Sequence, residues 1–170
     1  MRAALVLLPA LGLAACATAP MPPQVPGALQ PPAGQTLYLE ALARGVQIYD
    51  CAAKPDGSGL AWTFRAPEAN LTDRAGKPLG KHYAGPTWEA LDGSRVVGEV
   101  KARDPGPTPA TAIPWLLLAA KGHDGSGVLA EARSIQRVAT VGGVAPPAES
   151  CTAAGQEQRV YYTATYLFYR

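Results

Sequence analysis

Alternation of apolar and polar side chains along short segments constrains this chain more than any other sequence feature. Residues 60–66 and 95–101 carry apolar side chains at every second position, and residues 159–169 do so with tyrosine and phenylalanine. Successive side chains of a strand point to opposite faces, so this period predicts β-strands. The second face of 159–169 is also rich in apolar and aromatic residues, which predicts a strand that is central or covered on both sides.

Turn signals separate the alternating segments. Asp-Gly pairs at 56–57, 92–93 and 124–125 are each followed by serine. Asp-Gly between apolar runs is typical of hairpins, because glycine adopts positive φ without steric cost. Residues 113–120 are continuously apolar, and they are too few for a membrane helix, which needs about 20 residues. They are predicted to form a buried strand, whereas residues 36–44 fit either a strand or a helix. The pattern as a whole predicts a single all-β domain, an antiparallel β-sandwich or small β-barrel.

The N-terminus has the features of an export signal. Arg2 precedes an apolar run over residues 3–13, and Leu-Ala-Ala then leads to Cys16. A short basic start followed by an apolar core and small residues is typical of a secretory signal peptide. The ending resembles the bacterial lipobox, which implies cleavage before Cys16 and a lipid such as palmitate on that cysteine. The alternative is an ordinary signal peptide with a chance cysteine. Ala17 favours the outer membrane, by resemblance to enterobacterial sorting rules.

Proline marks the boundary of the folded domain. Six prolines fall between residues 20 and 32, and proline at this density disfavours helix and sheet pairing. We therefore expect a signal peptide over 1–15, a lipidated cysteine and proline-rich tether over 16–34, and the β-rich domain over 35–170. The expected location is the cell envelope, with the chain lipid-anchored there.

Charge excludes one class of partner. Charged residues make up 16% of the chain and the formal net charge is +2. Nucleic-acid binding needs clustered lysine and arginine, so no nucleic-acid partner is expected. The expected partners are the membrane, through lipid on Cys16, and a small molecule or an envelope protein.

Two cysteines remain for the domain. Cys51 and Cys151 lie about 100 positions apart, and in an oxidising compartment such a pair usually forms a disulfide. A reactive thiol or a zinc site is the alternative. Only two histidines, widely separated, are present, so neither a metal site nor a cofactor is predicted.

The richest polar segment begins at His82 and continues through Trp88, Glu89, Asp92 and Ser94. No established catalytic motif occurs in the chain. A small hydrolase would need Ser94 aligned with His82 and an acid. The simpler interpretation, which we favour, is a half-buried His82 that hydrogen-bonds to backbone.

Gln136 and Arg137 form a second polar pair between apolar neighbours. Arg137 is a candidate for binding an anionic ligand through two parallel hydrogen bonds. The commoner alternative is an ion pair within the domain, with Glu89 or Asp92 as the partner.

The order of these motifs resembles a known family. The chain is similar to the microbial family named domain of unknown function 3455 over residues 36–169, through the segments 45–51, 62–69, 82–94, 114–118, 135–146 and 162–168. The resemblance implies a secreted or surface β-rich domain and carries no assigned activity or catalytic residue.

Together these features favour an envelope lipoprotein whose β domain binds a ligand or a partner protein without catalysis. The candidate binding residues are His82, Trp88, Glu89, Asp92, Ser94, Gln136 and Arg137. The alternative is a small envelope hydrolase or metal-dependent enzyme centred on His82, Asp92 and Ser94.

Overall fold

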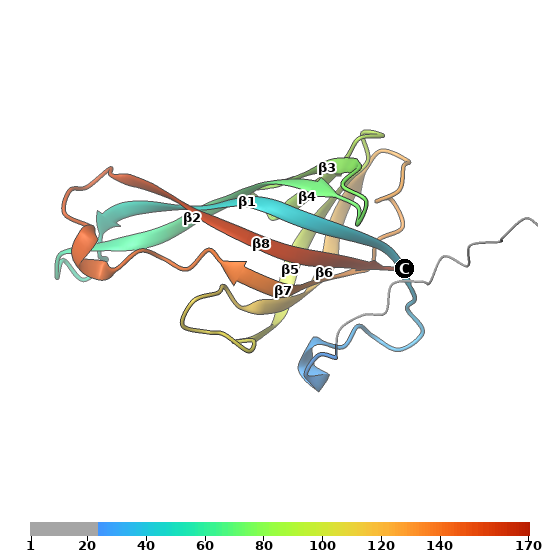
Figure 1. Ribbon diagram of the computed structural model, residues 1–170, viewed down its shortest axis with the longest axis horizontal. Helices are drawn as coiled ribbons and strands as arrows, with labels where there is room; N and C mark the ends of the chain where they lie inside the picture. The colour runs from blue at the N-terminus through green and yellow to red at the C-terminus, as the bar shows by residue number, and fades with distance from the viewer. Residues whose placement is uncertain (1–23) are drawn as a thin grey trace, which may run out of the picture.

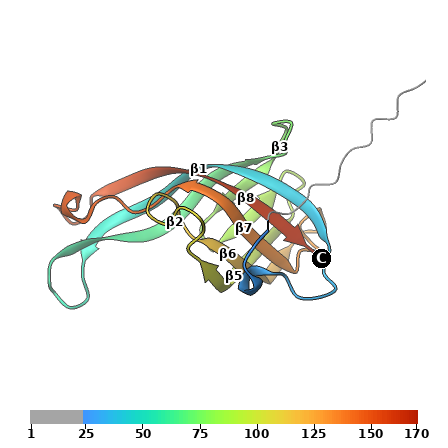
Figure 2. The same ribbon diagram turned by 60° about the horizontal axis from the view of Figure 1, so that its bottom comes forward.

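Eight antiparallel strands close into a single barrel in the computed structural model, which describes residues 24–170 (Figures 1 and 2). Each strand pairs with the next one in sequence, and the last strand returns to pair with the first. Of the two predicted architectures, the barrel is therefore the one observed. The predicted signal peptide and Cys16 lie outside the described residues. The strands are β1 (Leu37–Ala53), β2 (Leu60–Thr72), β3 (Pro78–Tyr83), β4 (Thr87–Ala90), β5 (Arg95–Asp104), β6 (Trp115–Asp124), β7 (Ser134–Gly142) and β8 (Glu157–Tyr169).

The closure between β1 and β8 resolves the ambiguous segment at residues 36–44 as strand. Ala41 lies opposite Tyr166 in this pairing, and two backbone hydrogen bonds join Thr36 to Arg170. The pairing of β1 with β2 requires a small residue at one position. A Cβ added at Gly45 would lie 2.0 Å from the backbone oxygen of Glu68 on β2, so a side chain there would separate the strands.

One end of the barrel is filled by side chains. The β1 start and β8 end lie here, together with the β2–β3, β4–β5 and β6–β7 connections. The β6–β7 connection packs Leu129 and Ala132 onto the core, where they are 2% and 0% exposed. Backbone N–H groups of Val128 and Leu129 donate to Asp92 and Ser94, respectively. We term this the closed end.

The opposite end, which we term the open end, carries the β1–β2, β3–β4, β5–β6 and β7–β8 connections. The predicted disulfide is confirmed here, because Cys51 at the end of β1 is bonded to Cys151 in the β7–β8 connection. The hydroxyl of Tyr49 donates to the Gly143 carbonyl at 2.7 Å. Both contacts hold the β7–β8 connection against the barrel wall.

A segment before β1 packs on the outside of the barrel. The short 3₁₀ turn η1 (Gly27–Leu29) places Leu29 at 0% exposure, and the Gln136 side chain donates to the Leu29 carbonyl at 2.6 Å. The hydroxyl of Tyr169 in turn donates to Gln136. Part of the segment expected as a tether, residues 27–29, is therefore packed against the barrel. Within residues 24–170, no helix has the length and apolar character required to cross a membrane.

Candidate functional site

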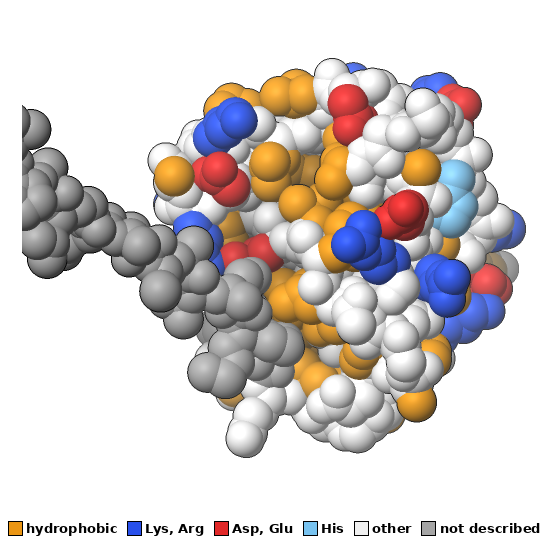
Figure 3. Space-filling view, turned by 90° about the vertical axis from the view of Figure 1, so that its right-hand side faces the viewer, with side chains coloured by type: hydrophobic (Ala, Val, Ile, Leu, Met, Phe, Trp, Pro, Cys, Tyr) orange, Lys and Arg blue, Asp and Glu red, His pale blue; other side chains and the backbone are white. Residues whose placement is uncertain are grey.

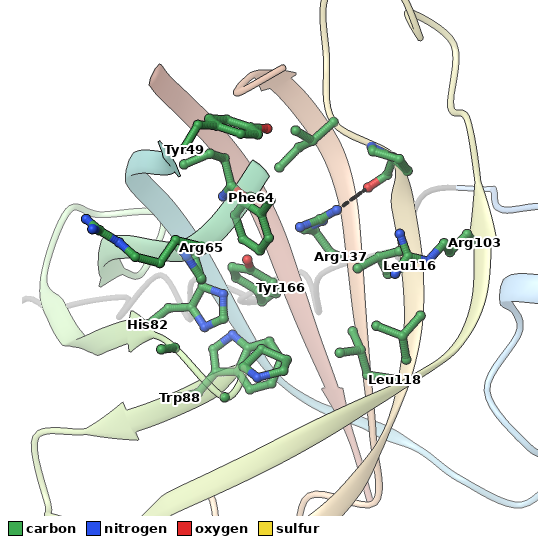
Figure 4. A pocket seen from close by; sticks show the side chains of 18 residues that line it. Tyr49, Phe64, Arg65, His82, Trp88, Arg103, Leu116, Leu118, Arg137 and Tyr166 are labelled. Carbon is green, nitrogen blue, oxygen red and sulfur yellow. Dashed lines mark hydrogen bonds between the residues drawn. The ribbon is translucent and has the colours of Figure 1, made fainter. Parts of the chain in front are cut away.

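A cavity of about 470 Å³ enters the barrel from the open end (Figure 4). Eight-stranded barrels have an interior just wide enough to be filled by side chains or to hold one small ligand. Side chains fill the interior at the closed end, whereas the open end leaves a cavity large enough for one small molecule. The cavity is lined by Gln47, Tyr49, Phe64, Arg65, Pro67, His82, Ala84, Gly85, Pro86, Trp88, Val100, Arg103, Ile113, Pro114, Leu116, Leu118, Arg137 and Tyr166.

Aromatic rings form the floor and one wall of this cavity. His82 stacks on Trp88 with ring centroids 4.5 Å apart, and Tyr166 lies 4.9 Å from His82 in a tilted arrangement. Tyr49 and Phe64 meet edge to face nearer the mouth. The Phe64 side chain is 49% exposed, so an apolar surface continues from the interior to solvent.

His82 is held as a neutral imidazole. Its Nδ1 lies 2.8 Å from the Thr87 carbonyl oxygen, which only accepts, so Nδ1 carries the proton. Burial lowers the pKa of His82 to about 3, the Thr87 hydrogen bond opposes this change, and the positive charge of Arg137 adds to it. The favoured interpretation of a backbone-bonded His82 is confirmed, although the residue is fully buried (3% exposed).

We expect His82 to make the domain less stable in mild acid. An unfolded histidine binds a proton near pH 6.5, whereas His82 in the folded barrel binds one only near pH 3. The unfolded state therefore takes up more protons between these values, and stability is lost as pH falls through that window, by at most about 1.4 kcal/mol per pH unit. Urea unfolding of wild type and His82→Asn between pH 7 and pH 5 measures the effect, because asparagine still donates to Thr87 but does not titrate. His123→Gln, at an exposed histidine of β6, controls for the loss of a histidine outside the cavity. The same slope in wild type and His82→Asn would contradict the assignment.

The strand register places two arginines level with each other in the cavity. Leu116 of β6 pairs with Arg103 of β5 on one side and with Arg137 of β7 on the other. Directly opposed residues in a sheet share a face, and all three line the cavity. Arg137 in turn lies opposite Tyr166 of β8. The structure therefore brings a positively charged row to the interior wall.

The charge on this row is not neutralised by acids. Nε and Nη2 of Arg137 donate to the Pro114 carbonyl at 3.1 and 2.8 Å (Figure 4). Within the described chain, neither Arg137 nor Arg103 has a carboxylate within 4.0 Å, and no aspartate or glutamate lines the cavity. Arg65 differs, because its guanidinium points away from the interior and pairs with Asp50 and Glu157.

The charges at the closed end show the opposite arrangement. Acidic and basic side chains are interspersed on this face, with apolar side chains between them (Figure 3). Arg74 pairs with Glu40 and Arg170 with Glu131. Charge compensation is thus the rule on this exposed face, and the arginine row inside the barrel departs from it.

Most of the predicted polar candidates lie away from the cavity. Glu89 accepts from the Tyr83 hydroxyl and pairs with Lys81, and the Ser94 hydroxyl donates to Asp92 at 2.6 Å at the closed end. The predicted ion pair between Arg137 and Glu89 or Asp92 is therefore wrong. Asp92 and Ser94 are instead occupied in holding the β6–β7 connection, as described above.

The side chains of Gln136 and Arg137 point to opposite faces of β7, although the two residues are adjacent in sequence. The side chains of adjacent strand residues point to opposite faces, so Gln136 contacts the outer segment at Leu29 while Arg137 lines the cavity. Of the predicted binding candidates, His82, Trp88 and Arg137 are brought together at the cavity.

Arg103 was not predicted, and the reason is a break in the alternation of β5. Val96 and Val100 face inward, but the pairing with β6 shifts between Val100 and Ala102. Such a bulge turns the following side chains over, so Arg103 enters the cavity wall. Phe64 carried a weaker signal as a member of the alternating segment 60–66, and Tyr49 only as part of the segment 45–51 in the family resemblance, with no indication that either lines a cavity.

The site has no metal-binding arrangement in the described residues, where no group of three or more histidine, cysteine, aspartate or glutamate side chains is close enough to hold an ion. What the cavity offers is aromatic and aliphatic surface, unpaired guanidinium groups and one unprotonated imidazole nitrogen.

Comparison with known proteins gives a family without an activity. The sequence matches, over residues 32–170, the family described as Protein of unknown function (DUF3455). No curated protein and no solved structure matches the chain. The match covers the whole barrel and most of the chain, so the protein belongs to the family of unknown function DUF3455.

Proposed function

We propose that this protein is a lipid-anchored envelope protein whose barrel binds a small, largely apolar molecule without catalysis. The cavity carries the proposal. Its volume of about 470 Å³ lies in the range of small-molecule sites, which are mostly apolar with a few convergent polar groups.

One residue of the cavity wall carries a buried polar atom without a partner in residues 24–170. Trp88 is 1% exposed and lines the cavity, and its indole N–H has no hydrogen-bond acceptor within the described protein. A buried donor without an acceptor costs about 1–3 kcal/mol.

The hydrolase alternative has less support. His82 is stacked inside the barrel with its proton directed at Thr87, whereas Ser94 donates to Asp92 at the closed end. A hydrolase needs the nucleophile within hydrogen-bonding reach of its base. Here His82 and Ser94 each bond to a different partner and not to each other.

The envelope part of the proposal rests on the N-terminal sequence. The apolar run before Cys16 and the lipobox-like Leu-Ala-Ala-Cys support export and lipid attachment. The disulfide between Cys51 and Cys151 fits an oxidising compartment. Mass spectrometry of the protein isolated from membranes tests it, since Cys16 should be N-terminal and carry acyl mass; a full-length N-terminus without lipid would contradict it.

A neutral, environment-sensitive dye tests the binding function. N-phenylnaphthylamine should bind the wild-type barrel saturably, with one site per chain. Val100→Trp places a large side chain in the cavity and should abolish binding, whereas Val97→Trp, on the same strand but outside this cavity, should leave it unchanged. Circular dichroism confirms that both variants fold. Equal binding by wild type and Val100→Trp would contradict a ligand site in the barrel.

A further inference from the structure

We infer that the ligand is an amphipathic anion whose acidic head group binds Arg137, with Arg103 as a second cation and the aromatic wall holding the apolar body. The inference rests on the proposed binding function and specifies the chemical class of the ligand. Its basis is the geometry of one guanidinium inside the cavity and the absence of acids around it.

The guanidinium of Arg137 has donors to spare. Arginine carries five N–H groups in a planar fork. The Pro114 carbonyl accepts from Nε and Nη2, which leaves one N–H on Nη2 and both on Nη1. Those remaining donors include the parallel pair that a planar carboxylate accepts. The Pro114 contact also fixes the orientation of the fork before any ligand arrives.

The surroundings favour a negative charge. Arg137 is half-buried, and the lining residues of the cavity include two further arginines and no carboxylate. Two acids neutralise Arg65, so the uncompensated charge is that of Arg137 and Arg103. Arg103 is exposed to solvent, whereas Arg137 is partly withdrawn from it. A charge withdrawn from water without a partner carries a desolvation cost, and an anion entering from solvent would compensate that cost at Arg137. A cationic or strongly polar ligand would leave this cost in place.

The rest of the cavity favours an apolar body attached to that head group. Leu116 and Leu118 lie on one side of Arg137, and Tyr166, Trp88 and Phe64 lie on the other (Figure 4). Each buried methylene contributes about 0.8 kcal/mol, so an alkyl or aromatic group gains affinity from this surface. A small inorganic anion would gain none of it.

Matched ten-carbon ligands separate the head group from the body. Decanoate and decyltrimethylammonium, below their micelle concentrations, and decanol, below its solubility limit, are titrated by calorimetry into wild type, Arg137→Met, Arg137→Lys and Arg44→Met. Arg44 lies on the exposed face of β1 without an ion pair, so its variant removes the same charge outside the cavity. Thermal unfolding confirms that each variant is folded.

Wild type should prefer decanoate to decanol and to the cation. Arg137→Met should weaken decanoate binding by about 10- to 100-fold, which is the usual effect of losing a hydrogen bond to a charged group. Arg137→Lys should lose part of the affinity for decanoate, because lysine keeps the charge but lacks the planar fork. Decanol binding should change little in either Arg137 variant. Arg44→Met should bind all three ligands as wild type does.

Three results would overturn the inference: equal affinity of wild type for decanoate and decanol, tighter binding of the cation, or undiminished decanoate binding by Arg137→Met. If one of these results were obtained while decanol or the neutral dye still bound wild type, the inference would fail and the proposed binding function would stand. If none of the three ligands and no neutral dye bound wild type, both the inference and the proposed function would fail.

Discussion

Replacing Cys51 and Cys151 together by alanine is expected to lower the free energy of unfolding by about 4–5 kcal/mol. The bond joins residues separated by 100 positions, with their Cα atoms 5.3 Å apart. In the chain-entropy account, a cross-link over a loop of this length removes about 4.7 kcal/mol of conformational freedom from the unfolded chain. Native domains are stabilised by only about 5–15 kcal/mol, so this bond is a large part of the total.

Removal of the disulfide should also loosen the folded state at the open end. The bonded β7–β8 connection also receives hydrogen bonds from Tyr49 and from Trp62, whose indole N–H donates to Ser150 at 3.0 Å. We expect the connection to exchange amide protons faster in the double variant, while the closed end keeps its protection.

Urea unfolding followed by far-ultraviolet circular dichroism measures the stability effect. Wild type treated with a thiol reductant under unfolding conditions provides the matched control, since it loses the same bond without a change of side chain. A loss below about 1 kcal/mol in the double variant would show that the unfolded chain gains little freedom from bond removal, and it would contradict the entropic account.

Trp88→Ala is expected to destabilise the barrel by about 3–5 kcal/mol. Trp88 is 1% exposed. Its ring stacks on His82 and makes edge-to-face contacts with Tyr166 and Phe168. The fit is close, because a Cβ added at Gly98 on β5 would lie 2.8 Å from the indole. Truncation removes apolar contact area and leaves a void that a closed barrel is too constrained to fill.

The same substitution should enlarge the ligand cavity, since Trp88 lines it. Urea unfolding gives the stability change, and titration with the neutral dye gives the change in binding. Trp88→Phe keeps an aromatic ring and provides the graded control, for which we expect a smaller loss of stability. If Trp88→Ala were as stable as wild type, the aromatic cluster would not be a structural element of the barrel.

Local features of the fold were predictable from the sequence because they depend on near neighbours. Alternation located parts of β2, β5 and β8, a continuous apolar run located β6, and the Asp-Gly pairs located three turns. The short strands β3 and β4 were not predicted. The disulfide followed from cysteine number and compartment. The strand over residues 36–44 could not be distinguished from a helix, because its identity depends on pairing with β8, more than a hundred residues later.

The site was less predictable because it depends on register around the whole barrel. Arg137 was recognised as a candidate, but the predicted ion pair does not form, since Glu89 and Asp92 point to other surfaces. Arg103 was not predicted, because the register shift between β5 and β6 turns its side chain from the expected outer face to the inner face of the barrel. His82 and Ser94 are near in sequence, yet a strand and a turn carry their side chains to different partners.

An amide NMR titration of the protein with decanoate tests the central claim most directly, because it locates the ligand as well as detecting it. The account predicts saturable shifts confined to the cavity-lining strand segments, such as those around Tyr49, Val100, Leu116 and Arg137, with the closed end around Ser94 and Leu129 unchanged. Saturable shifts that cluster at the closed end or on the outer face, or no saturable shifts at all, would contradict it.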